Sequence, residues 1–177
     1  ASRSGATPAA PDQLLRESDI ITIHVDERAS NRHLLNAAAF AKLKPDGTIS
    51  TREWVKGLNA PTGLALYDRT LYAADVDELV EINVASGEIV KRHEAKGAIF
   101  LNDVAVGQDG TVYVSDTPMN TIWRLKDGLF EPWLANDALK GPNGLLVEGD
   151  RLIVSSFGQL PDQGTPELGG LLAIDLN

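Results

Sequence analysis

Apolar residues in the last two-thirds of the chain recur in short runs that alternate with polar residues, a pattern that predicts β-strands. Turn residues separate the runs, as in Gln108-Asp109-Gly110 and Lys126-Asp127-Gly128. An Asp-Gly pair between two such runs is a strong hairpin signal. From Thr48 onward the sequence therefore predicts an all-β region. The expected strands are 48–55, 63–67, 70–74, 78–84, 88–93, 102–106, 111–115, 121–125, 129–134, 144–148, 151–155 and 170–176.

These strands belong to a unit that occurs three times. The tetrad Thr62-Gly63-Leu64-Ala65 returns as Asn102-Asp103-Val104-Ala105 and again as Asn143-Gly144-Leu145-Leu146, at offsets of 40 and 41 residues. A period of roughly 40 to 50 residues with about four strands per unit is typical of a β-propeller blade. Propellers usually need four to eight blades to close. The three units therefore predict a partial propeller.

The first 45 residues follow a different pattern. Residues 12–18 predict a short helical turn, and the β-branched run 20–25 is typical of a strand buried on both faces. Residues 36–44 predict a helix that begins at Asn36 and ends before Pro45. The predicted fold is mainly β: a partial β-propeller of about three four-stranded blades with a short N-terminal α/β segment. We place the two domains at residues 1–45 and 46–177.

Composition narrows the classes of partner. The net charge of −9 argues against nucleic acid and against an anionic membrane surface, since both would repel the chain. The absence of cysteine excludes disulfides, thiolate catalysis and cysteine-type zinc sites. No stretch approaches the roughly 20 apolar residues of a membrane span, so we expect a soluble chain. It shows no signal-peptide pattern and ends within a strand, which suggests a processed or truncated product and leaves its localisation open.

Four segments keep the order and spacing of the motifs of one known family. They are WVKGLNAPTG at 54–63, FLNDVAV at 100–106, DGTVYVSD at 109–116 and GPNGL at 141–145. Through these segments, residues 46–177 resemble the senescence-marker-protein/gluconolactonase family of six-bladed propellers. The resemblance implies hydrolysis of a sugar lactone with a divalent cation, often Ca²⁺, that polarises the carbonyl or activates water. It also implies that Asn143 binds the metal and that Asn102 and Asp103 lie on the substrate side.

The remaining ligands of that family have no counterpart here. Its metal-binding Glu lies in a blade that would precede Thr48, and its later Asp lies in a blade beyond Asn177. One amide oxygen gives little affinity for Ca²⁺, which takes six to eight oxygens. We therefore expect a lactonase-like fragment that is inactive in this form. The alternative is a non-catalytic propeller scaffold or binding module, in which Asn102 and Asn143 satisfy backbone groups of turns.

Three further motifs place residues 1–45 near another family: LLRESDIITIHV at 14–25, NRHLLN at 31–36 and FAKLKP at 40–45. They resemble the D-2-hydroxyacid dehydrogenases, near phosphoglycerate dehydrogenase, and the whole sequence thus reads as a chimera. The segment lacks the glycine fingerprint that binds a dinucleotide's pyrophosphate. An NAD-binding dehydrogenase fragment is therefore the second alternative.

Several polar and aromatic residues favour structural roles. Asp75 and Asp116 end the second strand of their units and are expected to cap turns, and the tryptophans are expected in the core between blades. His93 follows Lys91 and Arg92 and is expected on a solvated edge. Three blades would leave strand edges and apolar faces open. A homodimer that completes six blades, with a small sugar lactone as ligand, is the predicted partnership.

Overall fold

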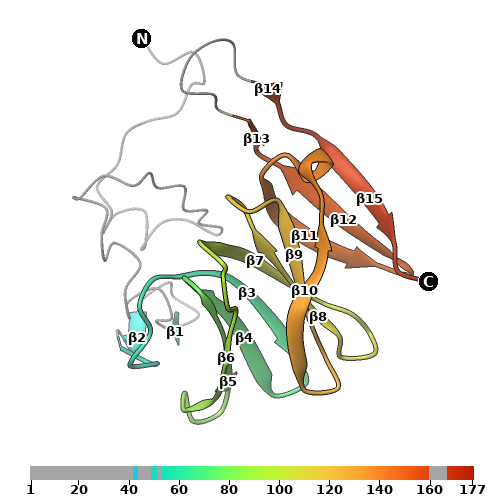
Figure 1. Cartoon of the computed structure of the whole chain (residues 1–177). Helices are drawn as coiled ribbons and strands as arrows, with labels where there is room; N and C mark the ends of the chain where they lie inside the picture. The colour runs from blue at the N-terminus through green and yellow to red at the C-terminus, as the bar shows by residue number, and fades with distance from the viewer. Residues whose placement is uncertain (1–41, 44–48, 52, 160–166) are drawn as a thin grey trace, which may run out of the picture. The chain divides into compact units, whose positions relative to one another are not determined.

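The computed structural model describes residues 42–43, 49–51, 53–159 and 167–177 (Figure 1). The chain divides into two compact units, residues 1–57 and 58–177. In the described part of the first unit, β1 (Lys42–Leu43) pairs antiparallel with β2 (Ile49–Thr51). The predicted helix at 36–44 is therefore wrong at Lys42 and Leu43, because these two residues pair with Thr51 and Ile49 of β2 instead of continuing a helix. The other elements expected before residue 42, and the domain boundary at 45, lie outside the described residues.

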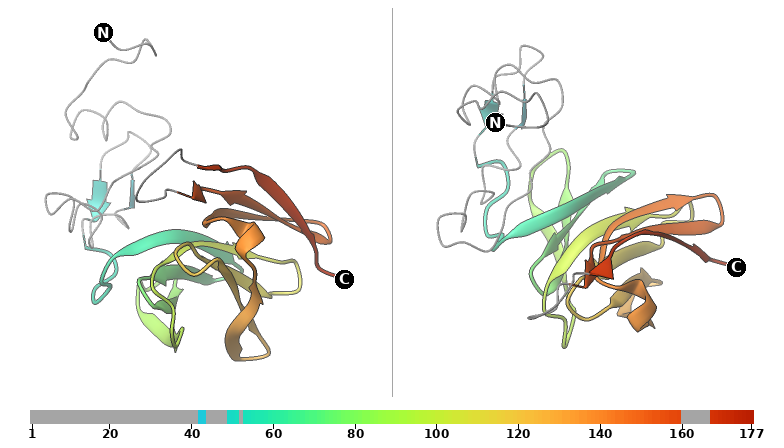
Figure 2. Two further views of the ribbon diagram at one scale, coloured as in Figure 1. Left: turned by 45° about the horizontal axis from the view of Figure 1, so that its top comes forward. Right: turned by 90° about the horizontal axis from the view of Figure 1, so that it is seen from above.

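The second unit contains three antiparallel sheets that follow one another in chain order (Figures 1 and 2). We call them blade 1, blade 2 and blade 3. Blade 1 consists of β3 (Pro61–Tyr67), β4 (Thr70–Asp75), β5 (Glu78–Asn83) and β6 (Ile89–Glu94). Blade 2 consists of β7 (Leu101–Val106), β8 (Val112–Asp116), β9 (Thr121–Lys126) and β10 (Leu129–Ala135). Blade 3 consists of β11 (Pro142–Glu148), β12 (Arg151–Ser156) and β15 (Leu171–Asp175).

The predicted four-stranded blades are present in blades 1 and 2, whereas the third sheet has three strands among the described residues. A small hairpin of β13 (Gly158–Gln159) and β14 (Glu167–Leu168) lies in the connection from β12 to β15. A short 3₁₀ helix, η2 (Asp137–Leu139), joins blade 2 to blade 3. Within the described residues, no helix has the length and apolar character needed to cross a membrane.

The hairpin that joins β9 to β10 shows why an Asp-Gly pair predicts a turn. Asp127 and Gly128 both have positive φ, 52° and 82°. Two consecutive left-handed residues are what a tight two-residue hairpin turn requires, and Asp-Gly is a favoured pair for it. The strand limits predicted from alternation agree with the structure to within about two residues throughout the second unit.

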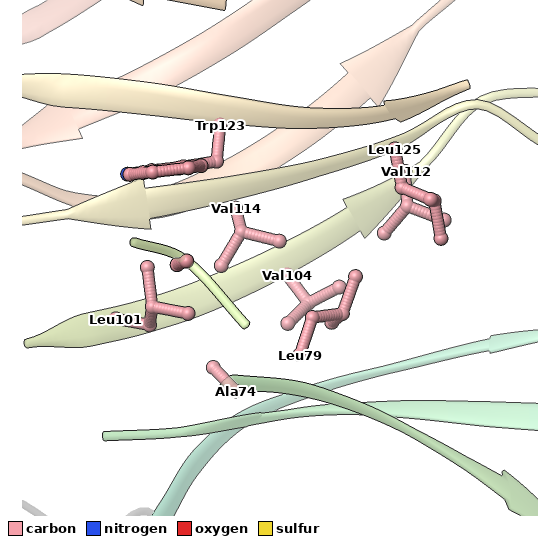
Figure 3. Close-up of a cluster of buried hydrophobic side chains, with 9 residues drawn as sticks. Ala74, Leu79, Leu101, Val104, Val112, Val114, Trp123 and Leu125 are labelled. Carbon is pink, nitrogen blue, oxygen red and sulfur yellow. The ribbon is translucent and has the colours of Figure 1, made fainter. Parts of the chain in front are cut away.

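Alternation along each strand gives every blade two apolar faces. We call the face that packs on the next blade in the chain the forward face, and the one that packs on the previous blade the backward face. The forward face of blade 1 contributes Ala74 and Leu79, with Ala65 and Tyr72 against them. The backward face of blade 2 meets these residues with Val104, Val112, Val114, Trp123 and Leu125 (Figure 3). Burying each large aliphatic side chain contributes about 1.5–3 kcal/mol, so this layer holds blades 1 and 2 together.

A second layer of the same kind lies between blades 2 and 3. Ala105, Tyr113 and Ile122 come from the forward face of blade 2. Leu152 and Val154 come from the backward face of blade 3, with Leu145, Val147, Leu172 and Ile174 packed around them. The core of the second unit thus consists of two layers between neighbouring blades.

The aromatic side chains occupy these layers as expected. Trp123 is buried between blades 1 and 2, with its ring centroid 5.4 Å from that of Phe130. Trp133 packs on the other layer, 5.2 Å from Tyr113 between ring centroids. The prediction of core roles is therefore confirmed for these two tryptophans.

The prediction for His93 is wrong. Its side chain lies in the interior, and its Nε2 atom is 2.6 Å from Oε1 of Glu81. The cause is strand alternation, because His93 pairs with Leu79 and therefore shares the forward face of blade 1. The charged neighbours Lys91 and Arg92 do not determine the side to which His93 points.

Candidate functional site

Each innermost strand of the three blades contains a β-bulge at the same place. In blade 2, Leu101 pairs with Asp116 and Val104 pairs with Val114, so three steps along β7 match two steps along β8. The same shift occurs between Pro61 and Leu64 of β3 and between Pro142 and Leu145 of β11. The bulged residues are Thr62-Gly63, Asn102-Asp103 and Asn143-Gly144, and we call these six the bulge tier. Bulges re-aim side chains and are over-represented next to active sites.

Two fully buried carboxylates hold the loops that lead into the bulges. Asp75 accepts hydrogen bonds from the backbone N–H groups of Asn59 and Ala60, at 2.9 and 2.6 Å. Asp116 accepts from those of Ile99 and Phe100, at 3.1 and 3.3 Å. Their predicted structural role is confirmed. Both carboxylates are therefore occupied by the framework of the tier.

Side-chain hydroxyls join the innermost strands of neighbouring blades. Thr62 donates to the carbonyl oxygen of Leu101 at 3.0 Å, which links blade 1 to blade 2. Ser115 donates to the carbonyl oxygen of Asn143 at 2.7 Å, which links blade 2 to blade 3. The sequence analysis did not assign a role to Ser115. The signal was its place directly before Asp116 in the repeated strand, where blade 3 also has a serine, Ser155.

Asp103 is wedged between its two neighbouring blades. Its Oδ2 atom accepts the backbone N–H of Leu145 from blade 3 at 2.7 Å, and its own N–H donates to Oγ of Ser115 at 3.0 Å. The glycine at the equivalent position of blade 1 leaves room for it, because a β-carbon at Gly63 would lie 2.4 Å from its Cα atom. Burial raises the pKa of Asp103, partly opposed by the N–H groups of Leu145 and Val104. Asp103 therefore acts at least as a cross-link between blades.

The two asparagines of the tier differ from its other polar residues. Asn102 and Asn143 are half-buried, and their side-chain amides form no hydrogen bond with any residue that the structure describes. The alternative reading, in which these amides satisfy turn backbone groups, thus has no such bond in the described part of the chain. By contrast, the Asn136 side chain accepts from the N–H of Ala138 and caps η2. The amides of Asn102 and Asn143 are the groups of the tier that are free to meet a ligand.

The donor set does not suit a tight calcium site. The tier contains one carboxylate, two amides and one hydroxyl, and one oxygen of the carboxylate already accepts the N–H of Leu145. Among the described residues, no three His, Cys, Asp or Glu side chains gather where they could hold a metal ion. Calcium takes six to eight oxygens, with carboxylates prominent among them. The described residues therefore do not fit the full metal site that the family resemblance implies.

Comparison with known families finds a match for the N-terminal segment alone. Residues 1–50 match the model of the NAD-binding domain of D-isomer specific 2-hydroxyacid dehydrogenases. This agrees with the resemblance of residues 1–45 to dehydrogenases. No curated protein matches the chain.

Comparison with solved structures identifies the fold of the rest. Hydrazine synthase of Kuenenia stuttgartiensis matches with 16% identity over 73% of this chain and 37% of that chain, at a TM-score of 0.56. The PQQ-bound aldose sugar dehydrogenase of Streptomyces coelicolor matches with 18% identity over 76% of this chain and 51% of that chain, at a TM-score of 0.54. A catalytically inactive virginiamycin B lyase from Staphylococcus aureus matches with 15% identity over 72% of this chain and 43% of that chain, at a TM-score of 0.50.

The chain spans between 37 and 51% of the length of these three proteins. The sugar dehydrogenase and the lyase are β-propeller proteins. At such identities the likeness concerns the fold alone. Together with the three stacked sheets, it confirms the predicted partial β-propeller, here preceded by a dehydrogenase-like segment.

Proposed function

We propose that the bulge tier is part of a sugar-lactone site of the gluconolactonase type, and that this chain binds a lactone weakly without hydrolysing it. The observation that carries the proposal is the pair of amides of Asn102 and Asn143. They occupy equivalent bulge positions on adjacent innermost strands and have no partner among the described residues. The other polar side chains of the tier, Thr62 and Asp103, hold the blades together.

The amides have the chemistry for this role. A side-chain amide can donate two hydrogen bonds to sugar hydroxyls or accept them at its oxygen. In the proposal Asn102, next to Asp103, contacts the lactone, and the amide oxygen of Asn143 faces the place of a divalent cation. Such a cation would supply polarisation of the lactone carbonyl. Because the tier offers fewer oxygen ligands than a Ca²⁺ site needs, we do not propose that the chain hydrolyses the lactone.

Thermal unfolding with glucono-δ-lactone as the probe tests the proposal. The lactone at millimolar concentrations should raise the melting temperature of the wild-type chain, since a ligand that binds the folded state stabilises it. The rise should be lost in Asn102→Ala and kept in Asn177→Ala, whose exposed side chain bonds Asp150 away from the tier. No rise in the wild type would refute lactone binding.

Hydrolysis is measured separately, by proton release with and without Ca²⁺. The proposal predicts the spontaneous rate at Ca²⁺ concentrations up to about 1 mM, the weak end of calcium sites in proteins. A Ca²⁺-stimulated rate that Asn143→Ala abolishes would mean that the chain holds a working site, against the proposal.

A non-catalytic scaffold is the second candidate, favoured by an exposed apolar face on blade 3. Leu146 and Leu171 are large and largely exposed on that face. In this case the lactone would have no effect and the chain would bind another protein surface. NAD binding by the N-terminal segment has only the family match at residues 1–50 in its favour, and a rise in melting temperature with NADH would support it.

A further inference from the structure

The residues that precede the two asparagines of the bulge tier differ in one respect, a backbone N–H. Leu101 directly precedes Asn102, and Pro142 directly precedes Asn143 at the equivalent place in the next blade. The N–H of Leu101 donates to the carbonyl oxygen of Val76 at 2.7 Å, which fixes the start of β7 against blade 1. Proline has no N–H. The same bond is therefore not open to Pro142 at the start of β11.

A side-chain hydroxyl holds the start of β11 instead. Thr117 is the first residue after β8, as Val76 is the first residue after β4, so the two hold equivalent positions. The Oγ1 atom of Thr117 donates to the carbonyl oxygen of Pro142 at 2.7 Å. Pro142 is buried, and a buried carbonyl that loses its partner is costly. The hydroxyl therefore fixes the peptide unit that Pro142 shares with Asn143.

Two hydroxyls of blade 2 hold Asn143 from both sides. Thr117 binds the carbonyl of the peptide unit before its Cα atom, and Ser115 binds that of the unit after it, each at 2.7 Å. The orientation of these two peptide units sets the direction of the Cα–Cβ bond. Ala74 takes the place of Ser115 in blade 1, so blade 1 offers no hydroxyl there to the carbonyl of Asn102.

We propose that Thr117 is a positioning residue whose hydroxyl, with that of Ser115, aims the amide of Asn143 at the ligand of the bulge tier. This inference rests on the proposed lactone site. The amide has no hydrogen-bond partner among the described residues, so its position depends on the backbone that carries it. A ligand that meets a preorganised group loses less free energy in ordering it. Loss of the Thr117 hydroxyl therefore weakens binding although Thr117 itself does not contact the ligand.

Two-dimensional proton–nitrogen NMR spectra of the full chain without ligand test the positioning. The side-chain NH₂ resonances of Asn143 and Asn102 are assigned by their loss in Asn143→Ala and Asn102→Ala. Thr117→Val keeps the shape of the side chain and removes the hydroxyl. It should shift the Asn143 resonances and leave those of Asn102 in place. Thr117→Ser has a hydroxyl again and should restore the wild-type positions.

Thr121→Val is the matched control. The hydroxyl of Thr121 also donates to a backbone carbonyl, that of Met119 at 2.9 Å, but this bond stays within the turn of blade 2. Thr121→Val should lower the melting temperature, as Thr117→Val does, and leave the Asn143 resonances in place. A merely structural role of Thr117 predicts the same unchanged resonances for Thr117→Val. Circular dichroism establishes that the variants fold, and Thr117→Ala is a second variant without the hydroxyl.

Titration with glucono-δ-lactone gives the second readout. Thr117→Val should weaken the affinity by about fivefold, the scale of one neutral hydrogen bond, while Thr117→Ser and Thr121→Val keep the wild-type affinity. Wild-type affinity in Thr117→Val, or Asn143 resonances that do not move in it, would overturn the inference. A wild type that does not bind the lactone would instead refute the proposed function, and the ligand-free spectra would still decide whether Thr117 positions Asn143.

Discussion

Asp103 gives the sharpest prediction about the bulge tier, because its charge and its hydrogen bond act in opposite directions. Its Oδ2 atom accepts the N–H of Leu145 at 2.7 Å. Asp103→Ala removes the acceptor and leaves that N–H without a partner, which costs about 1–3 kcal/mol. Asp103→Asn keeps an oxygen that can accept the N–H and removes only the charge.

The pKa of Asp103 gives the sign of the pH dependence. Burial, as the largest cause, raises this pKa above its ordinary value of 3.8 in the folded chain. The folded state then binds a proton more tightly than the unfolded state, so stability contributed by Asp103 falls as pH rises from 3.8 through the folded pKa. At neutral pH the charged carboxylate is a net cost that Asp103→Asn does not carry. We expect Asp103→Asn to match or exceed the wild type at pH 7.

Urea unfolding followed by circular dichroism between pH 3.5 and 7.5 measures both effects. Thermal unfolding gives a second readout. For a chain of this length, each kcal/mol lost from the free energy of unfolding lowers the melting temperature by about 2–4 °C, so Asp103→Ala should melt clearly below the wild type at pH 7. The difference in stability between Asp103→Asn and the wild type should grow in favour of Asn as pH rises through the acidic range. A loss in Asp103→Asn as large as that in Asp103→Ala would refute the reasoning, since it would mean that the charge itself holds the blades.

Two other substitutions test the packing between blades. Gly63→Ala places a β-carbon 2.4 Å from the Cα atom of Asp103, a backbone clash that should cost about 1–3 kcal/mol in urea unfolding, while Gly170→Ala, with open space around it, should be close to neutral. Equal effects of the two would show that Gly63 does not face Asp103. His93→Ala should lose about 1–3 kcal/mol because the side chain is buried against Glu81, and a change within about 0.5 kcal/mol would instead indicate a solvated edge.

The sequence predicted the strands of the second unit best, because apolar alternation and turn residues recur in every blade. Alternation and turn residues located the strands of the second unit, because a half-buried strand must alternate and a tight hairpin needs residues such as Asp127-Gly128. The two-residue strands β13 and β14 were missed, since such short strands leave no alternating pattern. The charged neighbours of His93 do not predict its burial, because its side of the sheet is set by its pairing with Leu79.

The site was only partly predictable. The repeated tetrads placed Asn102, Asp103 and Asn143 at one level of the three blades, and the structure brings them into one tier of bulges. The role of Asp103 as a cross-link did not follow from its own segment. It depends on Gly63 and on the N–H of Leu145, which lie about 40 residues away on either side and become neighbours only through the stacking of the blades.

The central claim is that three blades stack in series, so that the forward faces of blades 1 and 2 are covered by the blade that follows while that of blade 3 is exposed. Hydroxyl-radical footprinting with mass spectrometry tests this at single residues. Leu171 pairs with Ser155 in blade 3 as Ile122 pairs with Ser115 in blade 2, so the two residues hold equivalent positions. The account predicts that Leu171 is oxidised readily, whereas Ile122 is protected. Protection of Leu171 would show that the chain covers this face itself, and it would contradict the account.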